Sequence, residues 1–344
     1  MTQLEVEPIP GASTAREPIV LGANQPAARF YQGGEQIARF RAGAPAEPRT
    51  PEDWIGSVTT VRGQFPVGLT LLPDGRQLVD AISAAPTDWL GPAHVARFGS
   101  DAMLLVKLLD AGQRLPIHAH PDGKFAAAHI SAAHGKAEAW YILEPGTVYL
   151  GLTRDVDRDE LLEMVAGQHT ARLLSLMHAI EVAAHDTVFV PHGLLHAIGA
   201  GILLAEVQEP EDLSILLEWD GFELDGRADG HLGVGFEVAL TAVETRGRSR
   251  DEIAALLRHS QSDGSVLVDE SLPYFRLDRV TDGADIPPGF AIVIALEGLL
   301  TLTTAGGASV DLPAGSTTLV PFGAGAMRFA GSGTALVTRP PLAE

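Results

Sequence analysis

Two histidines separated by one residue, His118 and His120, follow an apolar run from Met103 to Leu109. Because side chains alternate along a strand, an extended chain would place both imidazoles on one face. Neutral imidazole is the commonest metal ligand in proteins, so this pair predicts a metal site. The chain contains no cysteine, and any further ligand must therefore be a histidine or a carboxylate.

Two later segments contain the missing ligand types. A strand over residues 135–141 would place Lys136 and Glu138 on one face, where charges are costly unless they are paired or bound. His196 follows a strand-like run and a tight Pro-x-Gly turn. Three imidazoles and one carboxylate suit Zn²⁺, Mn²⁺, Fe²⁺ or Co²⁺, and they leave open positions for a substrate.

A lone His-x-His pair is weak evidence, because one histidine on a strand is more often a core or surface residue than a ligand. The complete set of His118, His120, Glu138 and His196 favours a metal, because four independent residues are much less often in the right order by chance than one. His129 and His134 lie between the ligands in sequence, and they either line the site or are solvated loop residues. His134 is an acid–base candidate because its ordinary pKa is close to neutral pH.

The elements around these residues predict a mainly β protein. Short strand-like runs are separated by turns that contain Gly or Pro, as in β-sandwiches and barrels. Apolar spacing between residues 155 and 180 suits two helices that are broken near Gly167. The expected division is a metal-binding domain (1–150 and 181–235), a helical insertion (151–180), a helical linker (236–264) and a C-terminal β domain (265–344).

The net charge of −20 comes from 44 acidic and 24 basic residues among 344. This balance argues against nucleic acid or an anionic membrane as a partner, because both require clustered Lys or Arg. The N-terminal residues lack the basic and apolar regions of a signal peptide. The longest apolar run, residues 290–296, is far too short to span a membrane, so a cytoplasmic protein is expected.

Taken in order, the motifs Gly-x5-His-x-His, Glu and Pro-x-Gly-x-x-His resemble the two-part signature of the cupin barrel. The surrounding segments resemble type I mannose-6-phosphate isomerases, in particular the shorter bacterial members: residues 104–112, 118–122, 135–141 and 190–199. The resemblance implies a metal-binding cupin (jelly-roll) barrel and a second, C-terminal cupin-like domain without metal ligands. It also implies a cytoplasmic isomerase of carbohydrate metabolism that interconverts mannose 6-phosphate and fructose 6-phosphate.

In that family a Gln, a His, a Glu and a second His hold one zinc ion. His120, Glu138 and His196 match the last three of these ligands, and His118 stands where the family usually has Gln. Lys136 matches the family's lysine two residues before the glutamate. The resemblance therefore implies one divalent metal ion as the only cofactor, with zinc preferred and Mn, Fe or Co as alternatives.

The chain also departs from the family pattern. In the Ser-Asp-x-x-x-Arg stretch, whose arginine is implicated in catalysis, Asp212 keeps the acid but Leu216 stands at the arginine position. Guanidinium is the usual bidentate ligand of phosphate. Its loss indicates either a sugar without phosphate or another basic group in the same role. The nearby candidates in sequence are Arg114, Lys124 and Lys136.

Isomerisation through an enediol needs a base near the transferred proton and positive charge near the developing oxyanion. We expect Lys136 to supply the charge and Asp212, or else Glu206, to move the proton, with His134 as a further acid–base candidate. Two alternatives stay open. Three His and one Glu are also the ligand set of cupin dioxygenases, and a sugar-binding cupin without catalytic activity could keep the same scaffold.

Overall fold

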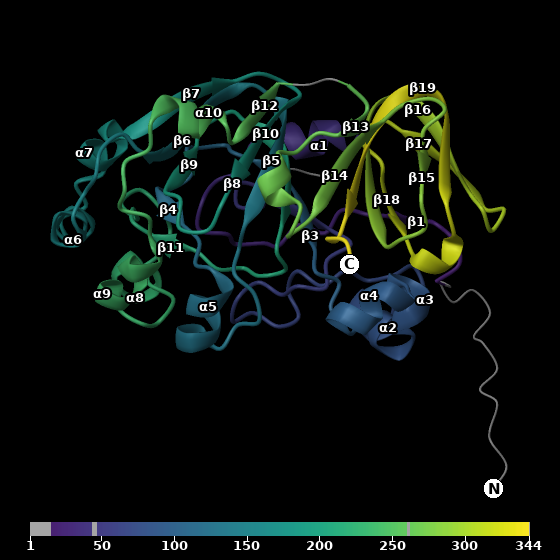
Figure 1. Ribbon diagram of the computed structural model, residues 1–344, viewed down its shortest axis with the longest axis horizontal. Helices are drawn as coiled ribbons and strands as arrows, with labels where there is room; N and C mark the ends of the chain where they lie inside the picture. The colour runs from purple at the N-terminus through teal and green to yellow at the C-terminus, as the bar shows by residue number, and fades with distance from the viewer. Residues whose placement is uncertain (1–14, 43–46, 260–261, 344) are drawn as a thin grey trace, which may run out of the picture.

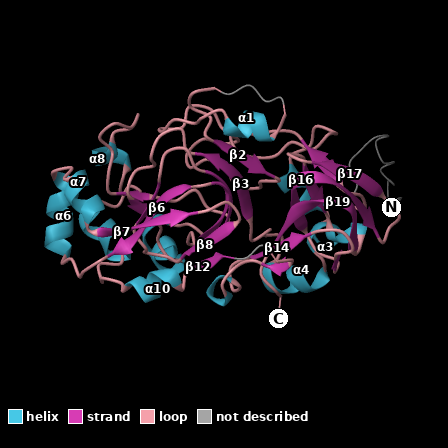
Figure 2. Ribbon diagram, turned by 90° about the horizontal axis from the view of Figure 1, so that it is seen from above, coloured by secondary structure: helices cyan, strands magenta, loops and turns pink. Residues whose placement is uncertain are grey.

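The computed structural model describes residues 15–42, 47–259 and 262–343. Its strands form three sheets in which every pairing between strands is antiparallel, and its helices lie at the edges of these sheets (Figures 1 and 2). The mainly β prediction is thus confirmed. None of the helices in the described ranges has the length and apolar character that crossing a membrane requires.

Two sheets form the part of the molecule that contains the predicted ligands. The first has the order β12-β8-β5-β10-β3-β2. Its strands are β2 (Glu52–Ile55), β3 (Leu105–Asp110), β5 (Glu138–Glu144), β8 (Asp186–Val190), β10 (Leu203–Gln208) and β12 (Leu257–His259). The second has the order β11-β4-β9-β6-β7. Its strands are β4 (His118–Ala119), β6 (Gly146–Leu152), β7 (Met177–Val182), β9 (His196–Ile198) and β11 (Ile215–Leu216).

The third sheet contains most of the C-terminal residues and is on the right in Figure 1. Its strands are β1 (Ile19–Leu21), β13 (Gly264–Ser265), β14 (Arg276–Val280), β15 (Asp285–Ile286), β16 (Ala291–Thr304), β17 (Ser309–Pro313), β18 (Thr317–Val320) and β19 (Met327–Arg339). Strand β1 pairs with β18, although the sequence analysis placed residues 1–150 in the first domain. The N-terminal strand therefore adds to the C-terminal sheet.

The helices are short. They are α1 (Gln36–Phe40), α2 (Leu78–Ala84), α3 (Pro86–Leu90), α4 (Pro92–Phe98), α5 (Gly123–Phe125), α6 (Arg158–Ala166), α7 (Thr170–Ser175), α8 (Gly226–Asp229), α9 (Phe236–Ala239) and α10 (Arg250–Ala254). A π-turn (Ala126–Ile130) follows α5, and 3₁₀ turns cover Leu240–Ala242, Asp269–Ser271 and Phe322–Ala324.

Local sequence explains the helical insertion. The Asp157 side chain accepts a hydrogen bond from the Glu160 backbone N–H, which caps the start of α6. After Gly167, Gln168 has a φ of 49°, a left-handed conformation that ends the helix before α7 begins. The two helices and the break near Gly167 are therefore as predicted, but the range 151–180 is not helical throughout: β6 ends at Leu152, and from Met177 the chain forms strand β7, which pairs with β6.

The segment at 236–264 is only partly helical. Helix α10 ends at Ala254, and the chain then forms strand β12, which pairs with β8. The apolar spacing of Asp251–His259 predicts one helix, but Leu257 instead adds to a sheet edge. Tertiary pairing thus overrides the local pattern.

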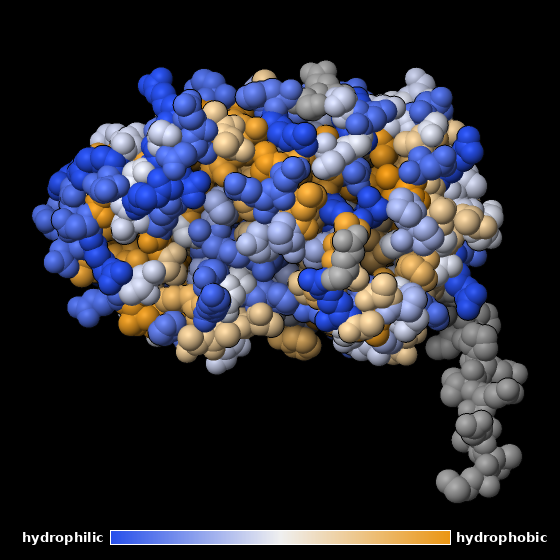
Figure 3. All heavy atoms as spheres, viewed as in Figure 1, coloured by the Kyte–Doolittle hydropathy of each residue, from blue (hydrophilic) through white to orange (hydrophobic). Residues whose placement is uncertain are grey.

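The core continues from the ligand-bearing sheets into the C-terminal sheet. Ile292 and Ile294 of β16 belong to the same buried cluster as Val106 and Trp140. The alternate residues of β16, such as Val293, face a second cluster inside the C-terminal part. On the face seen in Figure 3, hydrophilic side chains cover most of the projecting surface, and apolar groups show mainly between them.

Candidate metal centre

The three histidines predicted as ligands lie together between the two sheets of the first part. His118 and His196 are directly opposite each other in the β4–β9 pair, and their ring centroids are 4.0 Å apart. The ring of His120 is 5.0 Å from that of His118 and 4.8 Å from that of His196. All three side chains are buried. One nitrogen from each ring lies within 4.8 Å of the others, which is compatible with one shared cation.

Backbone carbonyls fix the orientation of all three rings. The Nδ1–H groups of His118, His120 and His196 donate to the carbonyls of residues 116, 213 and 194 at 2.8, 2.6 and 2.8 Å. A carbonyl can only accept, so Nδ1 carries the hydrogen and Nε2 carries a lone pair in each neutral ring. Such a hydrogen bond from the far nitrogen is typical of metal-binding histidines.

Glu138 of β5 completes the ligand set from the facing sheet. Its Oε2 lies 3.0 Å from the Nε2 of His120, and its Oε1 lies 3.3 Å from the Nε2 of His196. The indole N–H of Trp140 donates to Oε1 at 3.0 Å and holds the carboxylate in place. The structure thus brings His118, His120, Glu138 and His196 together, as the sequence predicts.

The electrostatics of these groups fit a divalent cation. Burial, with the neighbouring imidazoles, lowers the pKa of His118 well below its ordinary value; burial and Lys136 lower the pKa of His120 to about 3. Burial alone would raise the pKa of Glu138, but Lys136 and His120 hold it well below its usual range. Neutral imidazole lone pairs therefore face an ionised carboxylate, and neither group can donate a hydrogen bond to the other.

His196 is the clearest case. Its Nε2 is buried and has no hydrogen-bond partner in the described part of the chain. Lone pairs that converge at this distance repel each other unless a cation lies among them. This donor set fits a divalent metal ion, with His118, His120, Glu138 and His196 as the residues that would hold it.

Lys136 lies directly against the predicted ligands. Its ammonium donates to Oε2 of Glu138 at 2.5 Å and to Nε2 of His120 at 2.9 Å, and it lies 3.8 Å from Oε1 of Glu206. The side chain is buried, yet it lines the cavity described next. A fixed positive charge therefore stands beside the metal ligands.

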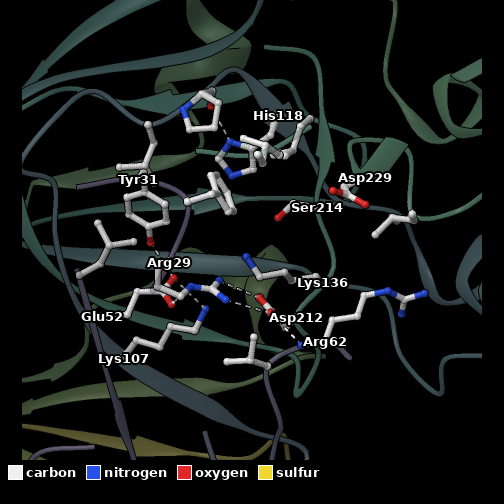
Figure 4. Close-up of a pocket in the computed structure, with 18 of the residues that line it drawn as sticks. Arg29, Tyr31, Glu52, Arg62, Lys107, His118, Lys136, Asp212, Ser214 and Asp229 are labelled. Atoms are coloured by element: carbon white, nitrogen blue, oxygen red, sulfur yellow. Dashed lines mark hydrogen bonds and ion pairs between the residues drawn. The ribbon is translucent and has the colours of Figure 1, made fainter. Parts of the chain in front are cut away.

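A cavity of about 530 Å³ opens over this centre (Figure 4). His118, Lys136 and Glu138 reach it from the ligand side. Aliphatic side chains form much of one wall, and they include Leu109, Leu115, Ile198, Leu216, Leu224 and Leu232. A second wall is densely charged, with Arg29, Glu52, Lys107, Glu206 and Asp212. The cavity thus offers an apolar surface, a charged surface and a metal centre to one ligand.

The charged wall is an ion-pair network. Arg29 binds Glu52 at 2.9 Å through Nε and Asp212 at 3.3 Å through Nη2 (Figure 4). Lys107 lies 3.7 Å from Oε1 of Glu52 and 3.4 Å from Oε1 of Glu206. Each of these cations is therefore matched by at least one buried carboxylate.

The two candidate acid–base carboxylates in this wall have opposite properties. Burial would raise the pKa of Asp212, but Arg29 and Lys107 hold it far below its ordinary value. Burial, reinforced by the charge of Glu138, raises the pKa of Glu206 in spite of Lys107 and Lys136. In addition, Oε1 of Glu206 is buried without a hydrogen-bond partner in the described residues.

Other predicted residues do not reach the cavity. His134 binds Asp101 at 2.6 Å and does not line the cavity. His129 packs against Phe125. Arg114 pairs with Glu218 at 2.5 Å, and Lys124 is exposed on α5. Of the three basic groups expected near Leu216, only Lys136 lines the cavity.

Several cavity residues were missed by the sequence analysis, above all Arg29, Glu52, Arg62 and Lys107. Lys107 carried a signal, since it is a charge with apolar residues on both sides in strand β3. Arg29 opens the segment Arg29-Phe30-Tyr31-Gln32-Gly33-Gly34, in which the sequence analysis assigned no site residue. Arg62 lies in a turn with no local pattern, and only tertiary structure places it at the site.

Comparison with known proteins gives a consistent result, although no family model matches the chain. A mannose-6-phosphate isomerase from Streptococcus mutans is 28% identical over 267 residues, which cover 75% of this chain and 77% of that protein. Mannose-6-phosphate isomerase ManA from Bacillus subtilis is 33% identical over 140 residues, or 39% of this chain and 43% of ManA.

Solved structures share the fold over nearly the whole chain. Mannose 6-phosphate isomerase from Bacillus subtilis superposes with a TM-score of 0.69 at 20% identity, covering 94% of this chain and all of that chain. A variant of phosphomannose isomerase from Salmonella typhimurium gives a TM-score of 0.73 at 16% identity, covering 95% of this chain and all of the other. The chain is thus similar in sequence to mannose-6-phosphate isomerases over about three quarters of its length, and it shares the fold of phosphomannose isomerases.

Proposed function

We propose that the chain is a metal-dependent aldose–ketose isomerase that interconverts mannose 6-phosphate and fructose 6-phosphate, with Zn²⁺ as its metal. The convergence of three imidazole lone pairs and the Glu138 carboxylate below an open cavity carries this proposal. The activity of the Streptococcus mutans and Bacillus subtilis relatives supports the choice of substrate. A nitrogen-rich ligand set with one carboxylate supports zinc.

The metal ion, when bound, would polarise the sugar carbonyl and orient the neighbouring hydroxyl group. Lys136 then places its ammonium beside the oxygen on which negative charge develops in the enediol. Because Lys136 is buried and hydrogen-bonded to Glu138 and His120, its charge is already oriented before the substrate arrives. The apolar wall packs against the C–H face of the sugar and excludes water from it.

Glu206 is the group best suited to move the proton between C1 and C2. A base works best when its pKa lies near the working pH, and burial shifts Glu206 in that direction. Asp212 is a weaker base because Arg29 and Lys107 stabilise its charged form. We therefore assign proton transfer to Glu206 and give Asp212 the role of holding Arg29 in the charged wall.

One observation favours a second candidate. His118 makes the ligand set three His and one Glu, which also suits redox metals such as iron. A dioxygenase at this site would consume O₂, whereas the isomerase would work under nitrogen with a redox-inert metal.

The test is an assay of the zinc-loaded protein in D₂O with mannose, fructose and their 6-phosphates, followed by NMR. We expect interconversion of the two phosphates with deuterium incorporated at the exchanging carbon, and no O₂ consumption. Glu206→Gln should lower kcat by about 10²- to 10⁴-fold with unchanged metal content, and Asp212→Asn should have a smaller effect. No exchange in any of the four sugars, or metal-dependent O₂ uptake, would contradict the proposal.

A further inference from the structure

A small polar recess adjoins the main cavity at its charged wall. Its volume is about 370 Å³, and Arg62 and Asp212 line both spaces. The other lining residues are Val58, Thr59, Thr60, Gly63, Pro210 and Glu211. We propose that this recess binds the phosphate group of the substrate, with the Arg62 guanidinium as its main ligand. The inference rests on the proposed function and names the residues that select a phosphorylated sugar.

The charges around the cavity single out Arg62. Arg29, Lys107 and Lys136 each lie within 4.0 Å of a wall carboxylate, so their charges are already matched. Arg62 lines the same cavity, but its side chain forms no ion pair within the described ranges of the chain. A phosphate needs a cation that is not already matched, because binding to a paired one would break an existing salt bridge.

The recess also contains an unused hydrogen-bond donor. Thr59 is only 8% exposed, and its Oγ1 has no hydrogen-bond partner among the described residues. A buried hydroxyl without a partner costs free energy, and a phosphate oxygen would satisfy it. Thr59 and Arg62 thus give the recess a neutral donor and a cation, the two kinds of group that usually bind phosphate.

The loop that carries these residues is held in place. The backbone N–H of Arg62 donates to Oδ2 of Asp212 at 3.1 Å, and Asp212 is itself bound by Arg29. A second bond joins the N–H of Val61 to the carbonyl of Val67 at 2.8 Å. In Figure 4, Asp212 lies between Arg29 and Arg62. The Arg62 guanidinium points away from the Lys107–Glu52 pair.

The two acids that line the recess have other partners. Asp212 is compensated by Arg29. Oε1 of Glu211 accepts hydrogen bonds from the backbone N–H groups of Ala133 and His134, at 3.1 and 3.4 Å; burial raises the pKa of Glu211, and the charge of Arg62 acts against that rise without a direct ion pair in the described residues. The Arg62 guanidinium is left as the group that can meet an anion.

The recess shares Arg62 and Asp212 with the main cavity, and none of the metal ligands lines it. Lys136 contacts the metal ligands, so the reacting carbons C1 and C2 belong at that end of the cavity. Arg62 touches none of these ligands, and its nearest named partner is Asp212 in the charged wall. A sugar bound with its carbonyl at the metal centre would therefore carry its 6-phosphate toward Arg62.

The experiment compares zinc-loaded wild type with Arg62→Ala, Thr59→Val and Arg328→Ala, the last an exposed arginine on β19 that serves as a matched control. We expect Arg62→Ala to reduce the ratio of kcat/KM for mannose 6-phosphate to that for mannose by about 10- to 100-fold. Thr59→Val should reduce it by about 3- to 10-fold without lowering the Tm, because it removes a buried unpaired hydroxyl. Arg328→Ala should leave the ratio unchanged.

Calorimetric titration with inorganic phosphate separates this inference from the proposed function. If the wild type isomerises neither sugar but binds phosphate, and Arg62→Ala weakens that binding at least 10-fold, the recess is a phosphate site but the isomerase assignment is wrong. If Arg62→Ala leaves both the selectivity ratio and phosphate binding within 2-fold of wild type, the recess is not the phosphate site. Failure of the wild type to bind phosphate would also overturn it.

Discussion

His118 is the residue at which this chain departs from the ligand set that its family resemblance implies. Its Nδ1–H bond to the backbone fixes the ring, and its Nε2 faces His196 across the β4–β9 pair. An imidazole binds zinc more strongly than the neutral amide of Gln does, so the change should tighten the site.

Replacing His118 tests this view directly. We expect His118→Gln to keep one metal ion and measurable isomerase activity, because a carboxamide oxygen can still reach the ion. His118→Ala should weaken metal binding by about 10- to 100-fold, with metal affinity measured by competition with a chromophoric chelator. Equal affinity in wild type and His118→Ala would remove this residue from the ligand set.

His134 has a different role from the one its position in sequence indicates. Its hydrogen bond to Asp101 raises its pKa above the ordinary value. A histidine whose pKa is higher in the folded than in the unfolded state contributes its full stabilisation at pH values below the unfolded pKa of about 6.5. This stabilisation is lost as the pH rises through the folded pKa. His134 is thus predicted to contribute to stability rather than to chemistry.

The corresponding measurement is urea unfolding of wild type and His134→Gln at pH 6 and pH 9. The variant should be less stable by about 1 kcal/mol at pH 6 and closer to wild type at pH 9. His259→Gln is a suitable control, because the His259–Asp186 pair has a 66% exposed histidine and should contribute less. A difference for His134→Gln that grows with pH would contradict this assignment.

At the scale of elements, the short strands that bear the ligands were predictable because ligand spacing and strand period agree. His118 and His120 lie at the end of one strand-like run, and Glu138 begins another. Strand β19 continues through Gly331, Ser332 and Gly333, residues that are poor strand formers. Pairing with β16 along its whole length overrides that local signal.

The N-terminal segment joins the two β parts in a way that no local pattern predicts. Arg41 binds Asp53 of β2 at 3.1 Å, and it also donates to the Leu21 carbonyl of β1 at 2.9 Å and to Thr317 of β18 at 2.8 Å. Both members of the ion pair are buried, since the Arg41 side chain is 6% exposed and that of Asp53 is 0% exposed. One guanidinium therefore connects three strands of two sheets.

Removal of this connection should be costly. Arg41→Ala leaves the buried Asp53 without its cation, and we expect a loss of about 3–5 kcal/mol in the free energy of unfolding. The double variant Arg41→Met/Asp53→Leu should recover much of that loss because no buried charge remains. Chemical denaturation gives the free energy of unfolding of both variants. A loss below about 1 kcal/mol in the single variant would show that the Arg41–Asp53 pair contributes little to stability.

At the scale of the whole molecule, the mainly β fold class was predictable from the sequence, and so was the set of four candidate ligands that the structure brings together, because both depend on short-range patterns. Arg29, Glu52 and Lys107 of the charged wall were not predicted, because they come from separate segments that meet each other and Asp212 only in the folded chain. Burial raises the pKa of both Glu206 and Asp212, and the neighbouring charges then separate them: Glu138 raises that of Glu206 further, whereas Arg29 and Lys107 hold that of Asp212 far below its ordinary value.

The central claim is that one divalent ion at His118, His120, Glu138 and His196 supports sugar phosphate isomerisation. The most direct test removes metal with a chelator and titrates Zn²⁺ back while the turnover of mannose 6-phosphate is followed. We expect no turnover without metal, a linear rise in turnover that ends at one equivalent of Zn²⁺, and no recovery in His196→Ala. Turnover that persists in the metal-free protein, or none at any metal loading, would contradict it.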